Sequence, residues 1–303
     1  MVGSIPTSPT LVEPPRHTCP REGAGPVGTI RLMAITTPGE VARLAGRLPG
    51  AMTPERGEEI HQFVRTHRPA SCLELGFANG VGALYIGSAL EANGFGTLTS
   101  VDRRRARNRR PQAGDLIESA GLSERVSLVY EETSYIWFLH DRLRAQLNAA
   151  GELEPCYDFV FIDGAHTWDV DGLAFTLADR LLAPGGWMLF DDLDWMLDER
   201  WRKVPDHQRS FAQVTEIWEL LVLTHQGYDT FRSDGHWGWA RKSTSDRPPT
   251  RLLVKRDLVG AALSLAQLGR ARLRAGRVNR GWRRVVARSQ RPMLPSGLES
   301  RAR

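Results

Sequence analysis

Hydrophobic and polar positions in the middle of the chain alternate between two patterns. Short apolar runs rich in β-branched and aromatic residues are typical of strands, and longer stretches with apolar residues at helical spacing separate them. The predicted strands are 71–75, 97–101, 126–130, 159–162 and 187–190, and the predicted helices between them are 81–92, 112–120, 135–149 and 170–182. This order predicts an α/β fold with a Rossmann-like, doubly wound, mostly parallel sheet.

Further elements are predicted on both sides of this core. The segment from Thr37 to Glu40 forms a capping box with proline at the first helical position, so a short helix should continue to Leu48. Thr53 and Pro54 begin another helix. The apolar positions of a later amphipathic helix are Phe211, Val214, Ile217, Trp218 and Leu221. The strand-like segments 228–231 and 236–240 predict an antiparallel pair at the edge of the sheet.

These patterns divide the chain into four segments. Residues 1–33 are rich in proline without hydrophobic periodicity, and we predict that they are disordered. Residues 34–70 are predicted helices that can serve as a lid. Residues 71–245 form the α/β domain, and residues 246–303 are a basic C-terminal extension with predicted helix.

The distribution of charge changes this picture more than the overall composition does. From Arg251 to the end, 14 lysines and arginines face two acids, so this segment carries +12 and leaves −7 for the rest of a chain whose net charge is +5. A mildly acidic body argues against a nucleic-acid groove across the fold. The extension has an apolar stripe at 258–268 followed by arginines. It is either an Arg-rich, partly disordered tail or a segment that binds an anionic membrane, an acidic partner or nucleic acid.

Three features bear on the cellular location. No apolar run approaches the roughly 18 residues of a membrane-spanning helix. The N-terminus lacks the apolar core of a secretory signal. Cys19, Cys72 and Cys156 are scattered without the spacing of a zinc site, which suits a reducing compartment. We therefore expect a cytoplasmic protein.

A glycine-rich turn follows the first predicted strand. Its glycines have the spacing G-x-x-x-G-x-G, are preceded by an acid and open a helix, whereas a dinucleotide turn has the spacing G-x-G-x-x-G. A pyrophosphate would be repelled by that acid, but a sulfonium cofactor with an amino-acid tail tolerates it. Asp102 at the end of the second strand can accept hydrogen bonds from both ribose hydroxyls. The candidate cofactor residues are Glu74, Gly76, Asn79, Gly80, Gly82 and Asp102.

The arginines that follow Asp102 allow a different interpretation. A basic run at 103–110 can accommodate the 2′-phosphate of NADP. The glycine spacing and the acid at Asp102 argue against this, and such a run is more often a solvated loop.

These motifs together resemble those of a known enzyme family. The segments 74–76 and 182–186 with Asp102 are similar to class I S-adenosylmethionine-dependent methyltransferases. The segments 161–166 and 190–192 resemble metal-dependent O-methyltransferases, above all the macrocin O-methyltransferase-like group, and more distantly catechol O-methyltransferase. The resemblance covers roughly residues 54–242. It implies S-adenosylmethionine as the cofactor, and by position it implicates Thr133 and Ser134 in adenine contact.

Three aspartates follow neighbouring strands of the predicted sheet. Asp163 follows the fourth strand, and Asp191 and Asp192 follow the fifth, so their carboxylates should converge beside the cofactor. Three carboxylates at one place repel each other without a cation, and oxygen ligands indicate Mg²⁺ or Mn²⁺. We expect Asp163 to face both the metal and the cofactor. A lone loop aspartate is commonly a turn residue or a helix cap, which is the alternative for each. Asp194 and Asp198 lie further along the loop and are excluded.

A histidine completes the predicted chemistry. His166 lies three residues after Asp163, where a neutral imidazole can take the proton of an acceptor hydroxyl; otherwise it only orients Asp163 or the substrate. The resemblance places a general base at this offset, and the macrocin-like group uses histidine there. Trp168, Trp195 and Trp201 can wall the substrate pocket or pack in the core.

The combined prediction is an O-methyltransferase that needs S-adenosylmethionine and Mg²⁺ or Mn²⁺. We expect it to act on a small polyol-like acceptor, such as a sugar hydroxyl of a natural product or polysaccharide, and to form a homo-oligomer without nucleic acid. One alternative is an oxygenase on the same fold, but two histidines and a carboxylate would suit iron better, and His166 is the only histidine evident. The other is a membrane or nucleic-acid adaptor that works through its tail.

Overall fold

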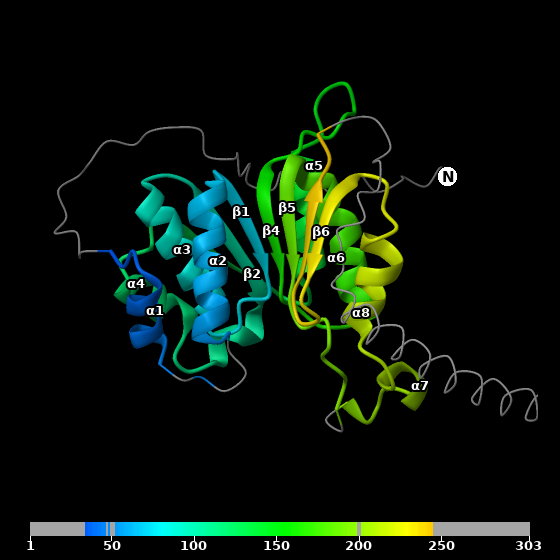
Figure 1. The fold of residues 1–303 in the computed structure, drawn as a ribbon, viewed down its shortest axis with the longest axis horizontal. Helices are drawn as coiled ribbons and strands as arrows, with labels where there is room; N and C mark the ends of the chain where they lie inside the picture. The colour runs from blue at the N-terminus through cyan, green and yellow to red at the C-terminus, as the bar shows by residue number, and fades with distance from the viewer. Residues whose placement is uncertain (1–33, 47, 49–51, 199–200, 245–303) are drawn as a thin grey trace, which may run out of the picture. The chain divides into compact units, whose positions relative to one another are not determined.

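A seven-stranded sheet runs through the part of the chain that the structure describes, a computed structural model covering residues 34–46, 48, 52–198 and 201–244 (Figure 1). The strand order is β3-β2-β1-β4-β5-β7-β6. The strands are β1 Ser71–Leu75, β2 Thr97–Arg103, β3 Val126–Glu131, β4 Tyr157–Ile162, β5 Leu182–Phe190, β6 Tyr228–Ser233 and β7 Gly238–Lys242. The first five are parallel, and β7 is antiparallel to both β5 and β6. The predicted Rossmann-like sheet with an antiparallel edge pair is confirmed.

Helices cover both faces of this sheet (Figure 1). The helices are α1 Pro38–Ala45, α2 Pro54–His67, α3 Val81–Asn93, α4 Ala113–Ser119, α5 Tyr135–Ala145, α6 Trp168–Leu181, α7 Asp206–Arg209 and α8 Gln213–Ile217, with a 3₁₀ turn η1 Arg104–Asn108 and a π-helical turn η3 Trp218–Val222. Of these, α7 lies away from the sheet (Figure 1). Along β4, Phe159 and Phe161 join the core under α1, α2 and α3, whereas Val160 and Ile162 join the core under α5, α6 and α8. Because successive side chains of a strand point to opposite faces, one apolar run supplies both cores.

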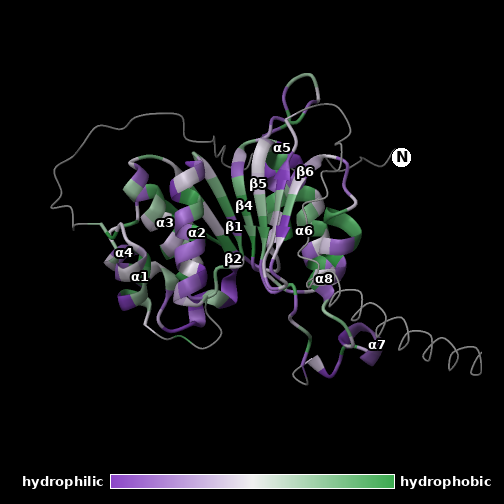
Figure 2. Cartoon of the chain, in the orientation of Figure 1, coloured by the Kyte–Doolittle hydropathy of each residue, from purple (hydrophilic) through white to green (hydrophobic). Residues whose placement is uncertain are grey.

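The first helices show how local sequence and burial combine. The Thr37 side chain accepts from the backbone of Glu40, and the Glu40 carboxylate accepts from the backbone of Thr37, so the predicted capping box is present. The helix ends at Ala45 and not at Leu48, because Gly46 takes a positive φ of 61°. The helix α3 is buried at every position from 81 to 90 and is largely hydrophobic in Figure 2, whereas α2, which packs on it, has a polar outer face.

Several element boundaries differ from the predicted ones. The helix α5 ends at Ala145 and not at residue 149, because the Asn148 side chain accepts from the backbone of Ala150 and Glu152 and starts a turn. The strand β2 continues two residues further, to Arg103. The strand β5 begins at Leu182, five residues earlier than expected, because Leu182 pairs with Tyr157 across an irregularity in β4.

The later amphipathic segment is also shorter than predicted. It consists of α8 followed by the π-helical turn, and Phe211 lies outside both and is exposed. Among the described residues, no helix is long and apolar enough to cross a membrane. The predictions for residues 1–33 and 246–303 lie outside the described residues.

Candidate active site

The turn after β1 is built from glycines that no larger residue can replace without a clash. Gly76 has a φ of 94°, and a Cβ there would lie 1.9 Å from the carbonyl oxygen of Asp163. A Cβ on Gly82 would lie 2.3 Å from Oε1 of Glu74. The turn therefore passes directly against the end of β4 and leaves the first turn of α3 open toward a cavity.

Two predicted cofactor residues support this turn without reaching the cavity. Glu74 is 1% exposed, accepts a hydrogen bond from the Ser100 hydroxyl, and is absent from the cavity lining. Burial raises the pKa of Glu74 to about 8, against the opposing effect of the Ser100 hydrogen bond. Gly80 faces Ala113 of α4 with a φ of 86°. Neither Glu74 nor Gly80 lines the cavity, so the structure gives both a supporting place behind its wall.

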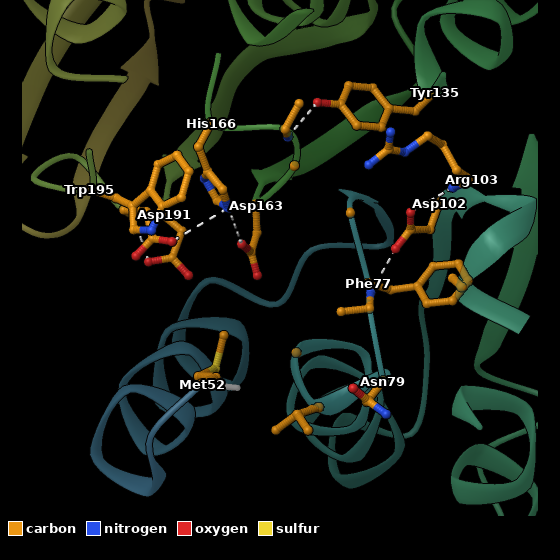
Figure 3. A pocket seen from close by; sticks show the side chains of 18 of the residues that line it. Met52, Phe77, Asn79, Asp102, Arg103, Tyr135, Asp163, His166, Asp191 and Trp195 are labelled. Carbon is orange, nitrogen blue, oxygen red and sulfur yellow. Dashed lines mark hydrogen bonds and ion pairs between the residues drawn. The ribbon is translucent and has the colours of Figure 1, made fainter. Parts of the chain in front are cut away.

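The remaining predicted cofactor residues line the cavity. Asp102 accepts the backbone N–H groups of Ala78 at 2.8 Å and of Arg103 at 2.6 Å, so its carboxylate is fixed at the end of β2 (Figure 3). The Asn79 side chain donates to the carbonyl of Pro111 at 2.7 Å. The other lining residues of the predicted set are Gly76, Gly82, Thr133, Ser134 and Asp163.

The arginine run is only partly a solvated loop. Arg104 pairs with Glu132, and the Arg107 guanidinium lies over the ring of Tyr130. Within this run, Arg103, Arg105 and Arg109 line the cavity. The structure thus adds a basic wall on the side of Asp102, which the interpretation as a solvated loop missed.

The cavity lies across the carboxyl ends of β1, β2, β4 and β5 and measures about 1000 Å³ (Figure 3). Opposite the glycine turn it is bounded by the start of α2, through Met52, Thr53 and Arg56. Of the three predicted pocket tryptophans, Trp195 and Trp201 line the cavity, but Trp168 does not and is exposed at the start of α6. The Trp195 ring packs on His166, with 5.1 Å between the ring centroids.

The three predicted aspartates all line this cavity, and Figure 3 shows Asp163 and Asp191 on the side of His166. Asp191 accepts from the indole N–H of Trp237 at 2.7 Å and from the backbone of Asp192 at 2.7 Å, and is 9% exposed. Removal of the Asp163 carboxylate from bulk water, followed by the charges of Asp191 and Asp192, raises the pKa of Asp163 well above its ordinary value. The pKa of Asp192 is also raised, by its removal from bulk water and by the charge of Asp191. Such a cluster favours a cation.

Two histidines, and not one, face these carboxylates. His166 Nε2 lies 3.5 Å from Asp192 Oδ2 and 3.9 Å from Asp163 Oδ1. His236 Nε2 lies 3.3 Å from Asp191 Oδ1 and 3.6 Å from Asp192 Oδ1. The hydrogen bond to Asp191 is the largest cause that raises the pKa of His236 to about 9. Two overlapping ligand groups result, one formed by Asp163, His166 and Asp192 and one by Asp191, Asp192 and His236.

His236 was not predicted, and the expectation that His166 is the only histidine at the site was wrong. The missing information was the register of the edge strand: Gly238 pairs with Phe190, so the residues before β7 lie beside those after β5. The position of His236 could have been predicted from the antiparallel pair, since the second predicted segment begins at residue 236.

A buried pair beneath the loop 164–166 holds His166 in place. Asp171 of α6 is 1% exposed and accepts the backbone N–H of His166 at 2.6 Å. The Tyr135 hydroxyl donates to Asp171 and accepts the backbone N–H of Ala165 at 3.0 Å. His166 has a φ of 54°, in the left-handed region. This strained conformation persists because several hydrogen bonds determine the loop.

Comparison with known proteins finds a family model that matches the central part of the chain. Residues 73–193, which include the glycine turn, Asp102, Asp163, His166 and both aspartates after β5, match the family model described as a methyltransferase domain. The chain contains a methyltransferase domain. The prediction of a class I methyltransferase is therefore confirmed. No curated protein matches the chain.

Solved structures share the fold of the methyltransferase domain at low identity. The SAH-bound methyltransferase PaMTH1 of Podospora anserina is 16% identical, with a TM-score of 0.51 over 68% of this chain and 86% of its own. An O-methyltransferase from Bacillus cereus in complex with SAH is 18% identical, with a TM-score of 0.48 over 71% of this chain and 94% of its own. The O-methyltransferase TomG of Streptomyces achromogenes, involved in tomaymycin synthesis and in complex with SAM, is 18% identical, with a TM-score of 0.47 over 68% and 87%.

Proposed function

We propose that the chain is an O-methyltransferase that uses S-adenosylmethionine and a divalent cation to methylate a hydroxyl of a small polyol-like acceptor. The observation that carries this proposal is that Asp102, the three aspartates and His166 share one cavity. The matched methyltransferase domain and the SAM- or SAH-bound structures of similar proteins support the choice of cofactor.

The cavity wall from β1 to β3 suits this cofactor. The Asp102 carboxylate is fixed by two backbone N–H groups and can accept the ribose hydroxyls. Gly76 and Gly82 line the part of the cavity where we assign the methionine part of the cofactor. Thr133 and Ser134 line the part of the wall after β3, where we assign adenine contact. S-adenosylmethionine would supply the methyl group.

The aspartate cluster suits a hard divalent cation, Mg²⁺ or Mn²⁺. Asp163, Asp191 and Asp192 offer oxygen ligands, and their mutual repulsion and removal from water are offset when a cation lies between them. Such a cation would lower the pKa of the acceptor hydroxyl. Among the described residues of this cluster, His166 and His236 each have a ring nitrogen within 4 Å of these carboxylates.

His166 is the proposed general base. Its Nε2 faces the cluster at 3.5 Å from Asp192, and Trp195 and the Asp171 hydrogen bond restrict the position of the ring. During transfer a bond forms between the acceptor oxygen and the methyl carbon, the bond from that carbon to sulfur breaks, and the hydroxyl proton moves to His166. Proton transfer of this kind contributes roughly 10²–10⁴ to the rate.

The cavity is large enough for an acceptor beside the cofactor, because about 1000 Å³ lies at the upper end of the range for small-molecule sites. Trp195 and Trp201 line the cavity, and aromatic faces suit sugar rings. We further propose that the enzyme works in the cytoplasm as a homo-oligomer and needs no nucleic acid.

A second candidate function follows from His236. His166, His236 and one carboxylate would form the set of two histidines and one carboxylate that binds Fe(II) in oxygenases. The methyltransferase proposal is better supported, because the glycine turn after Glu74 and the carboxylate of Asp102 suit S-adenosylmethionine and have no role in an iron oxygenase.

Transfer of a radioactive methyl group from S-adenosylmethionine to a panel of sugars and glycosylated natural products tests the proposal. Turnover should stop on exhaustive chelation and return with Mg²⁺ or Mn²⁺. It should fall roughly 10²–10⁴-fold in His166→Ala with little change in cofactor affinity. His140→Ala, a surface histidine on α5, is the control. Full activity after chelation would refute the metal, and turnover that needs Fe(II) and dioxygen would favour the oxygenase.

A further inference from the structure

His236 reaches the aspartate cluster through the pairing of β7 with β5. The pair Phe190 and Gly238 aligns the start of β7 with the end of β5, and the backbone N–H of Leu193 donates to the carbonyl of His236 at 2.9 Å. The imidazole therefore stands on a backbone segment that the sheet holds in place. It also lines the cavity.

The turn that carries His236 is fixed from its other side as well. The Asp234 carboxylate accepts the backbone N–H of His236 at 3.0 Å and that of Trp237 at 2.8 Å. Asp234 is in turn paired with Arg56 of α2. A side chain on such a prepared turn loses little further freedom when it binds a ligand.

Asp194 determines which ring nitrogen of His236 faces the cluster. Its Oδ1 lies 2.7 Å from Nδ1 of His236, so Nδ1 is the donor and Nε2 is directed at Asp191 and Asp192. A carboxylate on the far nitrogen is the usual support of a histidine that binds a metal. This explains the role of Asp194, which is too far along the loop to be a ligand itself.

The distances from His236 to Asp191 and Asp192 suit ligands of a single ion, and Asp163 belongs to the overlapping group that shares Asp192. Neighbouring ligands of an octahedral ion with bonds of about 2.1 Å lie ~3 Å apart. His236 Nε2 is 3.3 Å from Asp191 Oδ1 and 3.6 Å from Asp192 Oδ1, slightly wider than this spacing. A small movement of side chains around a cation would close the difference.

We propose that His236 is a nitrogen ligand of the cation, held by Asp194, so that the site is formed by Asp163, Asp191, Asp192 and His236. This rests on the proposed function. Four protein ligands leave two positions of an octahedral ion for others. Imidazole favours transition-metal ions, whereas carboxylates and water suit Mg²⁺. The site therefore discriminates in favour of Mn²⁺ over Mg²⁺ more strongly than three carboxylates would.

Pulsed electron paramagnetic resonance on the Mn²⁺-loaded full chain tests the assignment, because a directly bound imidazole nitrogen couples to the unpaired electrons. The coupling should be present in the wild type and change on labelling with ¹⁵N-histidine. It should disappear in His236→Gln and persist in His166→Gln. The matched control is His140→Gln, because His140 also lies beside an aspartate, 2.8 Å from Asp141, but outside the cavity lining.

Binding titrations provide a second readout. His236→Gln should weaken Mn²⁺ binding by roughly 10–100-fold and Mg²⁺ binding less, and Asp194→Asn should weaken Mn²⁺ binding by about tenfold. Saturable Mn²⁺ binding without a histidine coupling in the labelled wild type would overturn the inference and leave the proposed function intact. A coupling that His166→Gln removes and His236→Gln keeps would overturn it too. The absence of any Mn²⁺ or Mg²⁺ binding would instead contradict the metal dependence of the proposed function.

Discussion

Asp171 on α6 accepts the backbone N–H of His166 at 2.6 Å and so ties the proposed base to a helix that also lines the cavity through Val170. The same carboxylate accepts the Tyr135 hydroxyl and lies 3.3 Å from the backbone nitrogen of Ala165. Burial raises the pKa of Asp171, although each of these hydrogen bonds lowers it. A buried, hydrogen-bonded carboxylate of this kind fixes a loop in a conformation that it would otherwise leave.

Replacing Asp171 with asparagine should therefore impair the base without removing it. The amide has one oxygen for three donors, so the loop 164–166 loses at least one hydrogen bond to a charged group, worth about 1.5–3 kcal/mol. We expect kcat to fall by roughly 10–100-fold, the rate equivalent of that energy, with nearly unchanged affinity for S-adenosylmethionine. Asp169→Asn, an exposed position on the same helix, is the control. An equal loss of kcat and of cofactor affinity would indicate a general structural role.

Removing the carboxylate at the end of β2 should affect the cofactor alone. Asp102→Ala deletes the predicted acceptor of the ribose hydroxyls and should weaken S-adenosylmethionine binding by roughly 1.5–3 kcal/mol in calorimetry. Asp115→Ala on the exposed side of α4 should leave it unchanged. NAD and NADP should bind neither variant nor the wild type. Tight binding of a nicotinamide cofactor would contradict the interpretation of the glycine turn as part of an S-adenosylmethionine site.

The close approach of the turn to β4 predicts a contrast between two glycines. Gly76 and Gly94 both have positive φ, at 94° and 78°, but a Cβ on Gly94 has no neighbour within 4 Å, whereas one on Gly76 would meet Asp163. Gly94→Ala should cost about 1 kcal/mol of unfolding free energy, from backbone strain alone. Gly76→Ala should cost at least about 2 kcal/mol more, because it adds a backbone clash. If urea unfolding gives similar losses of unfolding free energy for the two variants, the turn at Gly76 can move away from Asp163.

The buried Glu74 predicts a dependence of stability on pH. Burial raises its pKa from an ordinary 4.5 to about 8, so the folded chain keeps a proton that the unfolded chain releases between these values. The unfolded state then binds fewer protons, and stability is lost as the pH rises from about 5 to 8. Glu74→Gln cannot titrate, so its unfolding free energy relative to the wild type should rise across this window, by at most about 1.4 kcal/mol for each pH unit. Parallel pH profiles of the two proteins would show that Glu74 is ionised in the fold.

The sequence alone determined the order of strands and helices and one part of the site. Apolar runs such as 159–162 predict buried strands because each side chain of the run meets a core on one face or the other. Asp102, Asp163, Asp191 and Asp192 were predictable for a related reason, since parallel strands bring their carboxyl ends to one edge. The capping box at Thr37 was predictable because its hydrogen bonds are local.

Only the tertiary structure decided which side chains face the cavity. Glu74 has the right place in the chain for a ligand contact, but the alternation of strand β1 turns it toward Ser100. His236 and Asp171 belong to the site through pairings and packing between distant segments, the first through the register of β7 on β5 and the second through α6 beneath the loop of His166. Such contacts depend on strand register and helix packing, which a linear pattern of apolar residues constrains weakly, because one step of register or one turn of helix changes the side chain that points inward.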